Sequence, residues 1–150
     1  MEPKTFAGTL DSLGLIRTYV TSAAQSAGLD NKATYKLCLA VDEIATNIIV
    51  HGYEEAGRSG VVDLQVTMDS TKLTVIIEDD GAPFDPRQSD LPSVDDLSTP
   101  LEDRRIGGLG VFLAFDGVDE FTYERSGERN RNVFVVNRQS PGHIQPSSKT

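Results

Sequence analysis

The N-terminal part of the chain carries apolar side chains at the spacing of a helix. From residue 11 onward they recur every three or four residues, at Leu13, Ile16, Val20 and Ala24. Gly28 follows them and is typical of a helix stop. The pattern predicts a first helix that ends before Gly28, preceded by a short edge strand over residues 5–9.

A second, longer helix is predicted from the N-cap Asp30 to about residue 50, with Gly52 as its C-cap. At about 100° per residue, four of its apolar side chains share one face. These are Leu37, Val41, Ile44 and Ile48. We expect this face to lie on the core.

The second half of the chain is predicted to form most of the strands. Residues 62–68 and 73–77 alternate apolar and polar side chains, which indicates an antiparallel hairpin. Residues 118–124 and 132–137 indicate two closing strands, and residues 109–115 a short apolar helix before them. This order predicts an α+β fold, a two-layer sandwich in which helices cover one face of a mostly antiparallel sheet.

Residues 80–106 fit none of these elements. They hold four prolines without sustained periodicity, and residues 78–103 carry nine acidic residues against one base, Arg87. A long connection without elements inside a compact domain is typical of a functional lid or of a disordered segment.

Length and charge narrow the class of protein. The 150 residues, 38% of them hydrophobic, suffice for one domain, predicted over residues 1–139 with a disordered tail over 140–150. The net charge of -9 argues against nucleic acid or an anionic membrane as a partner, because both would repel the chain.

The single Cys38 excludes a disulfide framework or a thiolate zinc site within one chain, and we expect it to pack in the core. No apolar run has the length of a membrane span and no signal-peptide core is present, so a cytoplasmic protein is expected.

A polar stripe runs beside the apolar face of the second helix. Glu43, Asn47 and His51 follow one another at intervals of four residues, at the rim of the predicted core. A shielded carboxylate can act as a general base, and an amide oxygen can bind a hard cation such as magnesium. The alternative is a helix edge with hydrogen bonding and no chemistry, and the spacing alone favours that alternative.

Two further segments are candidates for ligand binding. Asp79 ends an apolar strand and can accept a hydrogen bond from a ligand amino group, while Gly81 permits close approach of the backbone. An ordinary strand-ending turn uses the same residue types.

The second of these segments lies further along the chain. Gly107, Gly108 and Gly110 precede the apolar helix and follow Arg104 and Arg105, so free amides and local positive charge could hold a phosphate. The alternative is a flexible loop with a glycine-assisted helix start, and the segment matches neither GxxxxGK[ST] nor GxGxxG.

Taken together, these segments resemble a known family. ExxxNxxxH on a long helix, DxGxP after a strand, a proline-rich lid and GGLG before a helix occur in this order in the ATP-binding fold of DNA gyrase, heat-shock chaperone ATPases, MutL and sensor histidine kinases. The segments VDEIATNIIVHGY and RRIGGLGVFLAFDGVDE are most similar to the stand-alone bacterial anti-sigma-factor serine/threonine kinases. The resemblance covers about residues 5–137 and implies a Bergerat-type ATP-binding fold.

The resemblance implies a role for each matching residue toward ATP and Mg²⁺. Glu43 matches the general base toward the target hydroxyl, and Asn47 the ligand of the magnesium that bridges the phosphates. Asp79 matches the residue that reads the adenine amino group, and Gly81 the glycine beneath the base. His51 matches the end of the helix motif, without an assured catalytic role.

The phosphate side follows in the same way. The resemblance places Gly107, Gly108, Leu109 and Gly110 in the glycine box at the phosphates, with Arg105 within reach of them. Pro83 stands where the family has a second glycine on the adenine side. The lid is strongly acidic, so it is expected to be mobile until nucleotide and magnesium arrive.

Two functions are then open. The first is an anti-sigma kinase that phosphorylates a serine or threonine of an antagonist protein and sequesters a sigma factor; related kinases often form homodimers through a sheet face. The second is a non-catalytic, nucleotide-responsive module that only sequesters a partner. Glu43 favours the kinase, because a pure binding module needs no carboxylate one turn before Asn47.

Overall fold

The computed structural model describes residues 1–83 and 118–138. Its elements in chain order are β1 (Lys4–Ala7), the 3-10 turn η1 (Leu10–Ser12), α1 (Leu13–Ser26), α2 (Asn31–Asn47), the π-helical turn η2 (Ile48–Glu54), β2 (Val61–Met68), β3 (Lys72–Asp79), β4 (Glu120–Ser126) and β5 (Arg129–Asn137). Four predictions lie wholly or mostly outside the described residues: the lid, the helix over residues 109–115, the glycine segment and the tail.

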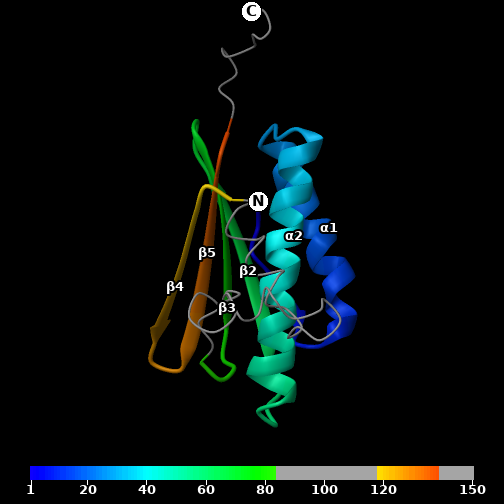
Figure 1. The fold of residues 1–150 in the computed structure, drawn as a ribbon, viewed down its shortest axis with the longest axis vertical. Coiled ribbons are helices and arrows are strands. Elements are labelled where there is room, and N and C mark those ends of the chain that lie inside the picture. The colour runs from blue at the N-terminus through cyan, green and yellow to red at the C-terminus, as the bar shows by residue number, and fades with distance from the viewer. Residues whose placement is uncertain (84–117, 139–150) are drawn as a thin grey trace, which may run out of the picture.

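The described strands form one sheet in the order β1-β2-β3-β5-β4, and each neighbouring pair is antiparallel. Helices α1 and α2 lie side by side on one face of this sheet (Figure 1). The predicted two-layer α+β architecture is thereby confirmed. The central strand β3 ends at Asp79, so the sheet itself positions that carboxylate.

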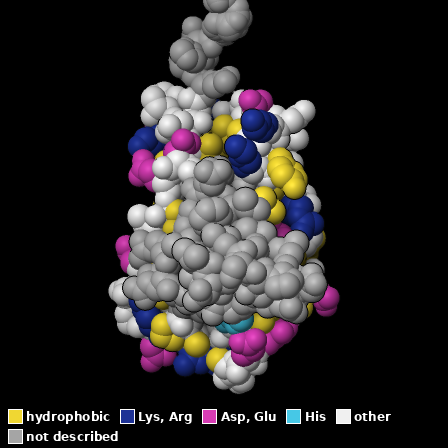
Figure 2. Space-filling model, in the orientation of Figure 1, with side chains coloured by type: hydrophobic (Ala, Val, Ile, Leu, Met, Phe, Trp, Pro, Cys, Tyr) yellow, Lys and Arg dark blue, Asp and Glu magenta, His cyan; other side chains and the backbone are white. Residues whose placement is uncertain are grey.

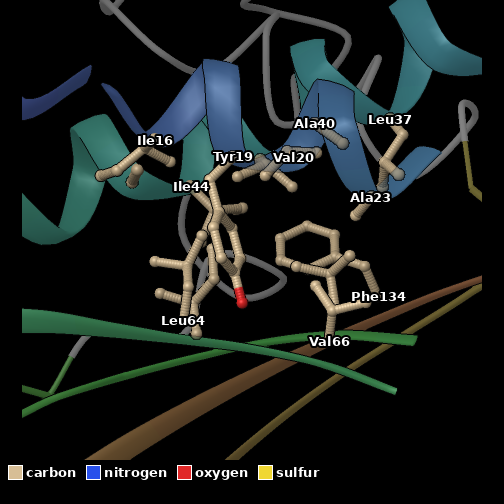
Figure 3. Packing of buried hydrophobic residues seen from close by; sticks show 14 of the residues in the cluster. Ile16, Tyr19, Val20, Ala23, Leu37, Ala40, Ile44, Leu64, Val66 and Phe134 are labelled. Carbon is tan, nitrogen blue, oxygen red and sulfur yellow. The ribbon is translucent and has the colours of Figure 1, made fainter. Parts of the chain in front are cut away.

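The hydrophobic core lies between the two helices and the sheet (Figure 3). All four residues of the predicted apolar face, Leu37, Val41, Ile44 and Ile48, are buried. Phe134 of β5 is fully buried between the helices and the strands. Burying a side chain of this size stabilises the fold by about 1.5–3 kcal/mol, so this face holds α2 firmly on the sheet.

The helix start and stop signals of the sequence are confirmed where the first two helices meet. Asp30 Oδ1 accepts a hydrogen bond from the amide of Ala33 at 2.7 Å, as an N-cap does. Gly28 has a φ of 81°, a left-handed conformation that glycine adopts without steric cost.

The predicted end of the second helix is wrong. Regular α-helix stops at Asn47, and η2 continues as a wider turn in which the amide of Glu55 donates to the carbonyl of Val50. Gly52 is buried inside this turn rather than forming a C-cap. The chain leaves at Gly57, whose φ is 68°. Short π-helical turns often occur at functional sites, and this one brings Gly52 against the sheet.

Candidate functional site

Two glycines join the end of the helix to the end of β3. The amide of Ala82 donates to the carbonyl oxygen of Gly52 at 3.0 Å. A Cβ added at Gly81 would lie 2.8 Å from that oxygen, which is too close for any side chain. The close backbone approach predicted at Gly81 is therefore present, and the approaching group is Gly52. η2, the end of β3 and the turn that joins β4 and β5 all lie at the lower end of the molecule in Figure 1.

Asp79 is the buried charge of this region, with 1% of its surface exposed. Its Oδ1 accepts from the amide of Gly81 at 2.8 Å and from Asn130 Nδ2 at 2.9 Å. Its Oδ2 is buried and has no hydrogen-bond partner among the described residues. Because burial disfavours the charged form, it raises the pKa of Asp79, and the bonds from Asn130 and Gly81 offset part of that effect. A buried acceptor without a partner is what a ligand donor would satisfy.

Asn130 on β5 connects Asp79 to the loop that follows it. Besides Asp79, its Nδ2 donates to the carbonyl oxygens of Gly81 at 3.1 Å and Ala82 at 3.3 Å. Its Oδ1 accepts from the Tyr123 hydroxyl at 2.5 Å and from Arg125 Nη1 at 3.0 Å. Tyr123 and Arg125 of β4 thus fix the orientation of the Asn130 side-chain amide, and this amide holds the end of β3 in place.

Tyr53 of η2 supports the same loop from the helix side. Its hydroxyl donates to the carbonyl of Val61 at 2.6 Å and accepts from the amide of Asp80 at 3.0 Å. The ring is packed so closely that a Cβ at Gly8 or Gly60 would lie within 3.0 Å of it. Burial raises the pKa of the Tyr53 hydroxyl, which stays a neutral donor and acceptor at neutral pH.

In the part of the chain that the structure describes, two buried side-chain amides also lack a hydrogen-bond partner at one atom. They are Nδ2 of Asn47, the last residue of α2, and Oδ1 of Asn132 on β5. Asn132 lies on the same face of β5 as Asn130, and its register partner Ile77 stands two residues before Asp79 on β3. Asn47 stands five residues before Gly52, where α2 passes into η2. These two atoms therefore lie at the end of α2 and on β5, the neighbour of the strand that ends at Asp79.

The other two residues of the polar stripe lie at the rim, as predicted. Glu43 is half-buried and precedes Asn47 by one turn of α2. His51 is half-buried in η2, and its Nδ1 lies 2.7 Å from Glu55 Oε1. This contact holds the imidazole toward the surface at the end of the turn.

Ion pairs on the outer face of the sheet hold Asp80, the neighbour of Asp79. Arg129 Nη1 contacts Asp80 Oδ1 at 2.9 Å, and Arg129 also bonds to Asp63. Arg131 pairs with Glu78 at 3.3 Å. On the face seen in Figure 2, acidic and basic side chains are likewise mixed around the rim of the described part.

The structure brings together two of the predicted site residues, Asp79 and Gly81, and η2 contacts the same loop through Gly52. Asn47 and Glu43 lie five and nine residues before Gly52 on α2. The remaining predicted residues, Arg105, Gly107, Gly108, Leu109 and Gly110, lie outside the described residues.

Sequence reasoning missed Asn130, Asn132, Tyr123, Arg125 and the supporting role of Tyr53. Asn130 and Asn132 lie four and two residues before the buried Phe134, but Val133 and Val135 are apolar as well, so the sequence did not show which face of the strand points inward.

Comparison with known proteins gives a consistent family. The model of the histidine kinase-like ATPase domain matches residues 6–135. The serine-protein kinase RsbW of Halalkalibacterium halodurans is 31% identical over 119 residues, which cover 75% of this chain and 70% of that protein. A protein of the same name from Staphylococcus aureus is 30% identical over 118 residues, covering 77% of this chain and 74% of that protein.

Solved structures show the same fold. The histidine kinase domain of a blue-light activated histidine kinase from Erythrobacter litoralis EL346 aligns with a TM-score of 0.52 at 22% identity, over 84% of this chain and 59% of that chain. The Acinetobacter baumannii histidine kinase AdeS aligns with a TM-score of 0.51 at 12% identity, over 93% of this chain and 69% of that chain. At these identities the likeness concerns the fold alone.

Proposed function

The chain belongs to the histidine kinase-like ATPase domain family, among the anti-sigma-factor kinases, and we propose that it is an ATP- and magnesium-dependent protein-serine/threonine kinase. Its substrate would be a serine or threonine of an anti-sigma-factor antagonist. When the antagonist is phosphorylated, the chain would instead bind and sequester a sigma factor. Both events belong in the cytoplasm, and among the described residues no helix is long and apolar enough to cross a membrane.

The observation that carries the proposal is the half-satisfied carboxylate of Asp79. Two donors of the chain saturate Oδ1, while Oδ2 is buried without a partner. The 6-amino group of adenine is a donor that Oδ2 can accept. The unpartnered Oδ1 of Asn132, on the neighbouring strand, is a second acceptor on the same face.

The residues present also fit a magnesium ion held mainly by phosphate and water. Among the described residues, no group of three His, Cys, Asp or Glu side chains could hold a metal ion. Magnesium needs only one or two protein ligands beside substrate phosphates, and the amide oxygen of Asn47 is suited to be one. When bound, magnesium would neutralise charge on the phosphates during transfer. Gly107, Gly108, Leu109, Gly110 and Arg105 are proposed to hold the phosphates.

Glu43 is proposed to accept the proton of the target hydroxyl. It stands one turn before Asn47 on a helix that packs on the core, so the helix sets the spacing between the proposed base and the proposed magnesium ligand. The half-buried position shields the carboxylate partly from water. The protein would then contribute the positioning of the reacting groups and one proton transfer.

The test combines binding and transfer. We expect calorimetry to show ATP binding that strengthens with magnesium, and labelled ATP to phosphorylate a purified antagonist protein of the source organism. Glu43→Gln should lower the rate of phosphorylation at least about 100-fold and leave the affinity for ATP near normal. Glu54→Gln, at an exposed glutamate of η2, is the matched control. Equal loss of binding and transfer in Glu43→Gln would overturn the role of Glu43, and no binding at millimolar ATP would favour a sequestering module.

A further inference from the structure

The amide of Asn130 is held in one orientation from both ends. Tyr123 and Arg125 donate to Oδ1, at 2.5 Å and 3.0 Å, so the oxygen must face β4. Nδ2 then faces Asp79 and the carbonyls of Gly81 and Ala82, all of which are acceptors. A rotated amide would place its oxygen against three acceptors and its nitrogen against the guanidinium of Arg125, which can only donate. The surroundings therefore exclude the rotated form.

This orientation decides which atom of Asp79 is available and in what form. With Asn130 and Gly81 both donating to Oδ1, that oxygen can carry no proton of its own. A proton could bind only to Oδ2, where it would change an acceptor into a donor. Each donor on Oδ1 favours the ionised carboxylate, and the bond from Asn130 is the one made by a side chain.

The two states of Oδ2 select different purines. An acceptor matches the 6-amino group of adenine and opposes the 6-oxo group of hypoxanthine or guanine. A donor reverses this preference. We propose that Asn130, oriented by Tyr123 and Arg125, is a positioning residue that keeps Oδ2 of Asp79 an acceptor and thereby sets the preference for a 6-amino purine nucleotide.

The proposal rests on the proposed ATP site and concerns its selectivity. Its readout is the ratio of the affinities for ATP and inosine triphosphate, which differ at position 6 of the base and share the same sugar and phosphates. A variant that only loosens the fold weakens both nucleotides together and keeps the ratio. A variant that frees Oδ2 to become a donor lowers the ratio.

The experiment is calorimetric titration of both nucleotides, with magnesium, into the full chain and its variants. Asn130→Leu is expected to reduce the preference for ATP about tenfold or more, because one donor to a buried charge is lost. The double variant Tyr123→Phe, Arg125→Met keeps Asn130 but removes both donors to its Oδ1, so only the acceptors around Nδ2 still orient the amide. It should shift the ratio in the same direction by a smaller factor. Tyr19→Phe is the control, since the Tyr19 hydroxyl donates to the carbonyl of Glu2 at 2.7 Å, away from this site.

The outcomes separate this inference from the function on which it rests. A wild-type protein that prefers ATP, with variants that keep its ratio, overturns the role of Asn130 alone. A wild-type protein that binds neither nucleotide overturns the ATP site and this inference together. If Asn130→Leu fails to fold, the double variant decides between the two results, because it leaves the buried asparagine in place.

Discussion

Replacing Asp79 with asparagine should change which base the site accepts. The amide of Gly81 and Nδ2 of Asn130 both donate to Oδ1 and cannot accept. In Asp79→Asn the new side-chain oxygen must therefore occupy the place of Oδ1. The new NH₂ group then takes the place of the unpartnered Oδ2, so an acceptor becomes a donor at the position proposed to read the base.

The size of the change follows from the two hydrogen bonds concerned. A hydrogen bond to a charged group contributes about 1.5–3 kcal/mol, so ATP should bind about 10-fold to 150-fold more weakly. A neutral bond from the new NH₂ to a 6-oxo group is worth about 0.5–1.5 kcal/mol, so inosine triphosphate should gain about two- to tenfold. The preference between the two nucleotides should therefore move by at least about twentyfold.

Calorimetric titration of both nucleotides measures this shift directly. Asp80→Asn is the matched control, because its neighbouring carboxylate is 56% exposed and pairs with Arg129 on the outer face of the sheet. It should leave the preference unchanged. The reasoning is refuted if Asp79→Asn binds ATP as the wild type does, or if it weakens both nucleotides by the same factor.

The substitution Asp79→Asn should also change the stability of the unliganded protein. Burial raises the pKa of Asp79 in the folded state, so the ionised carboxylate makes the unliganded fold less stable above that pKa. This cost disappears as the pH falls below the ordinary pKa of aspartate. Unliganded Asp79→Asn should then resist denaturant at least as well as wild type at neutral pH, and its advantage should shrink on acidification.

Two further substitutions test the supports of the site. Gly81→Ala should destabilise the fold by about 1–3 kcal/mol and weaken ATP binding, because its Cβ would lie 2.8 Å from the Gly52 oxygen. The control Gly14→Ala has open space around its Cβ and should stabilise the fold by up to about 1 kcal/mol. Tyr53→Phe should cost about 1–3 kcal/mol in denaturant unfolding, because the partners of its hydroxyl lose their bonds, and Tyr35→Phe, at a side chain that is 68% exposed, should cost nothing measurable.

The elements that the sequence predicted correctly are those with local causes. The N-cap at Asp30, the stop at Gly28 and the helical spacing of the core face involve residues only a few positions apart. The end of the second helix was predicted wrongly for the opposite reason. A glycine at position 52 is a local stop signal, but the bond from Ala82 to its carbonyl holds the helix in a wider turn. A contact between residues 30 positions apart in the chain overrode the local preference.

The asparagines of β5 show a second limit of sequence reasoning. The segment RNRN is polar at every position, so alternation cannot tell which side chains face inward. Only the register with β3 shows that Asn130 and Asn132 are buried, with Asn130 bonded to a carboxylate 51 residues earlier. Asp79 itself could be proposed from sequence, because it ends an apolar strand and carries a recognisable motif.

The unpartnered polar atoms of this site lower the stability of the unliganded fold, which argues that the site binds a ligand. Buried polar atoms without partners destabilise a protein, and each can be removed by an apolar substitution of similar shape. Among the described residues, Asp79, Asn47 and Asn132 each keep such an atom, at the end of β3, at the end of α2 and on β5. A ligand that supplies the missing partners stabilises the folded state through its own binding, by about 2.7 kcal/mol at a hundred times its dissociation constant. The adenine base and the magnesium-bound phosphates proposed here would supply them, so the unliganded protein should be markedly less stable than its nucleotide complex.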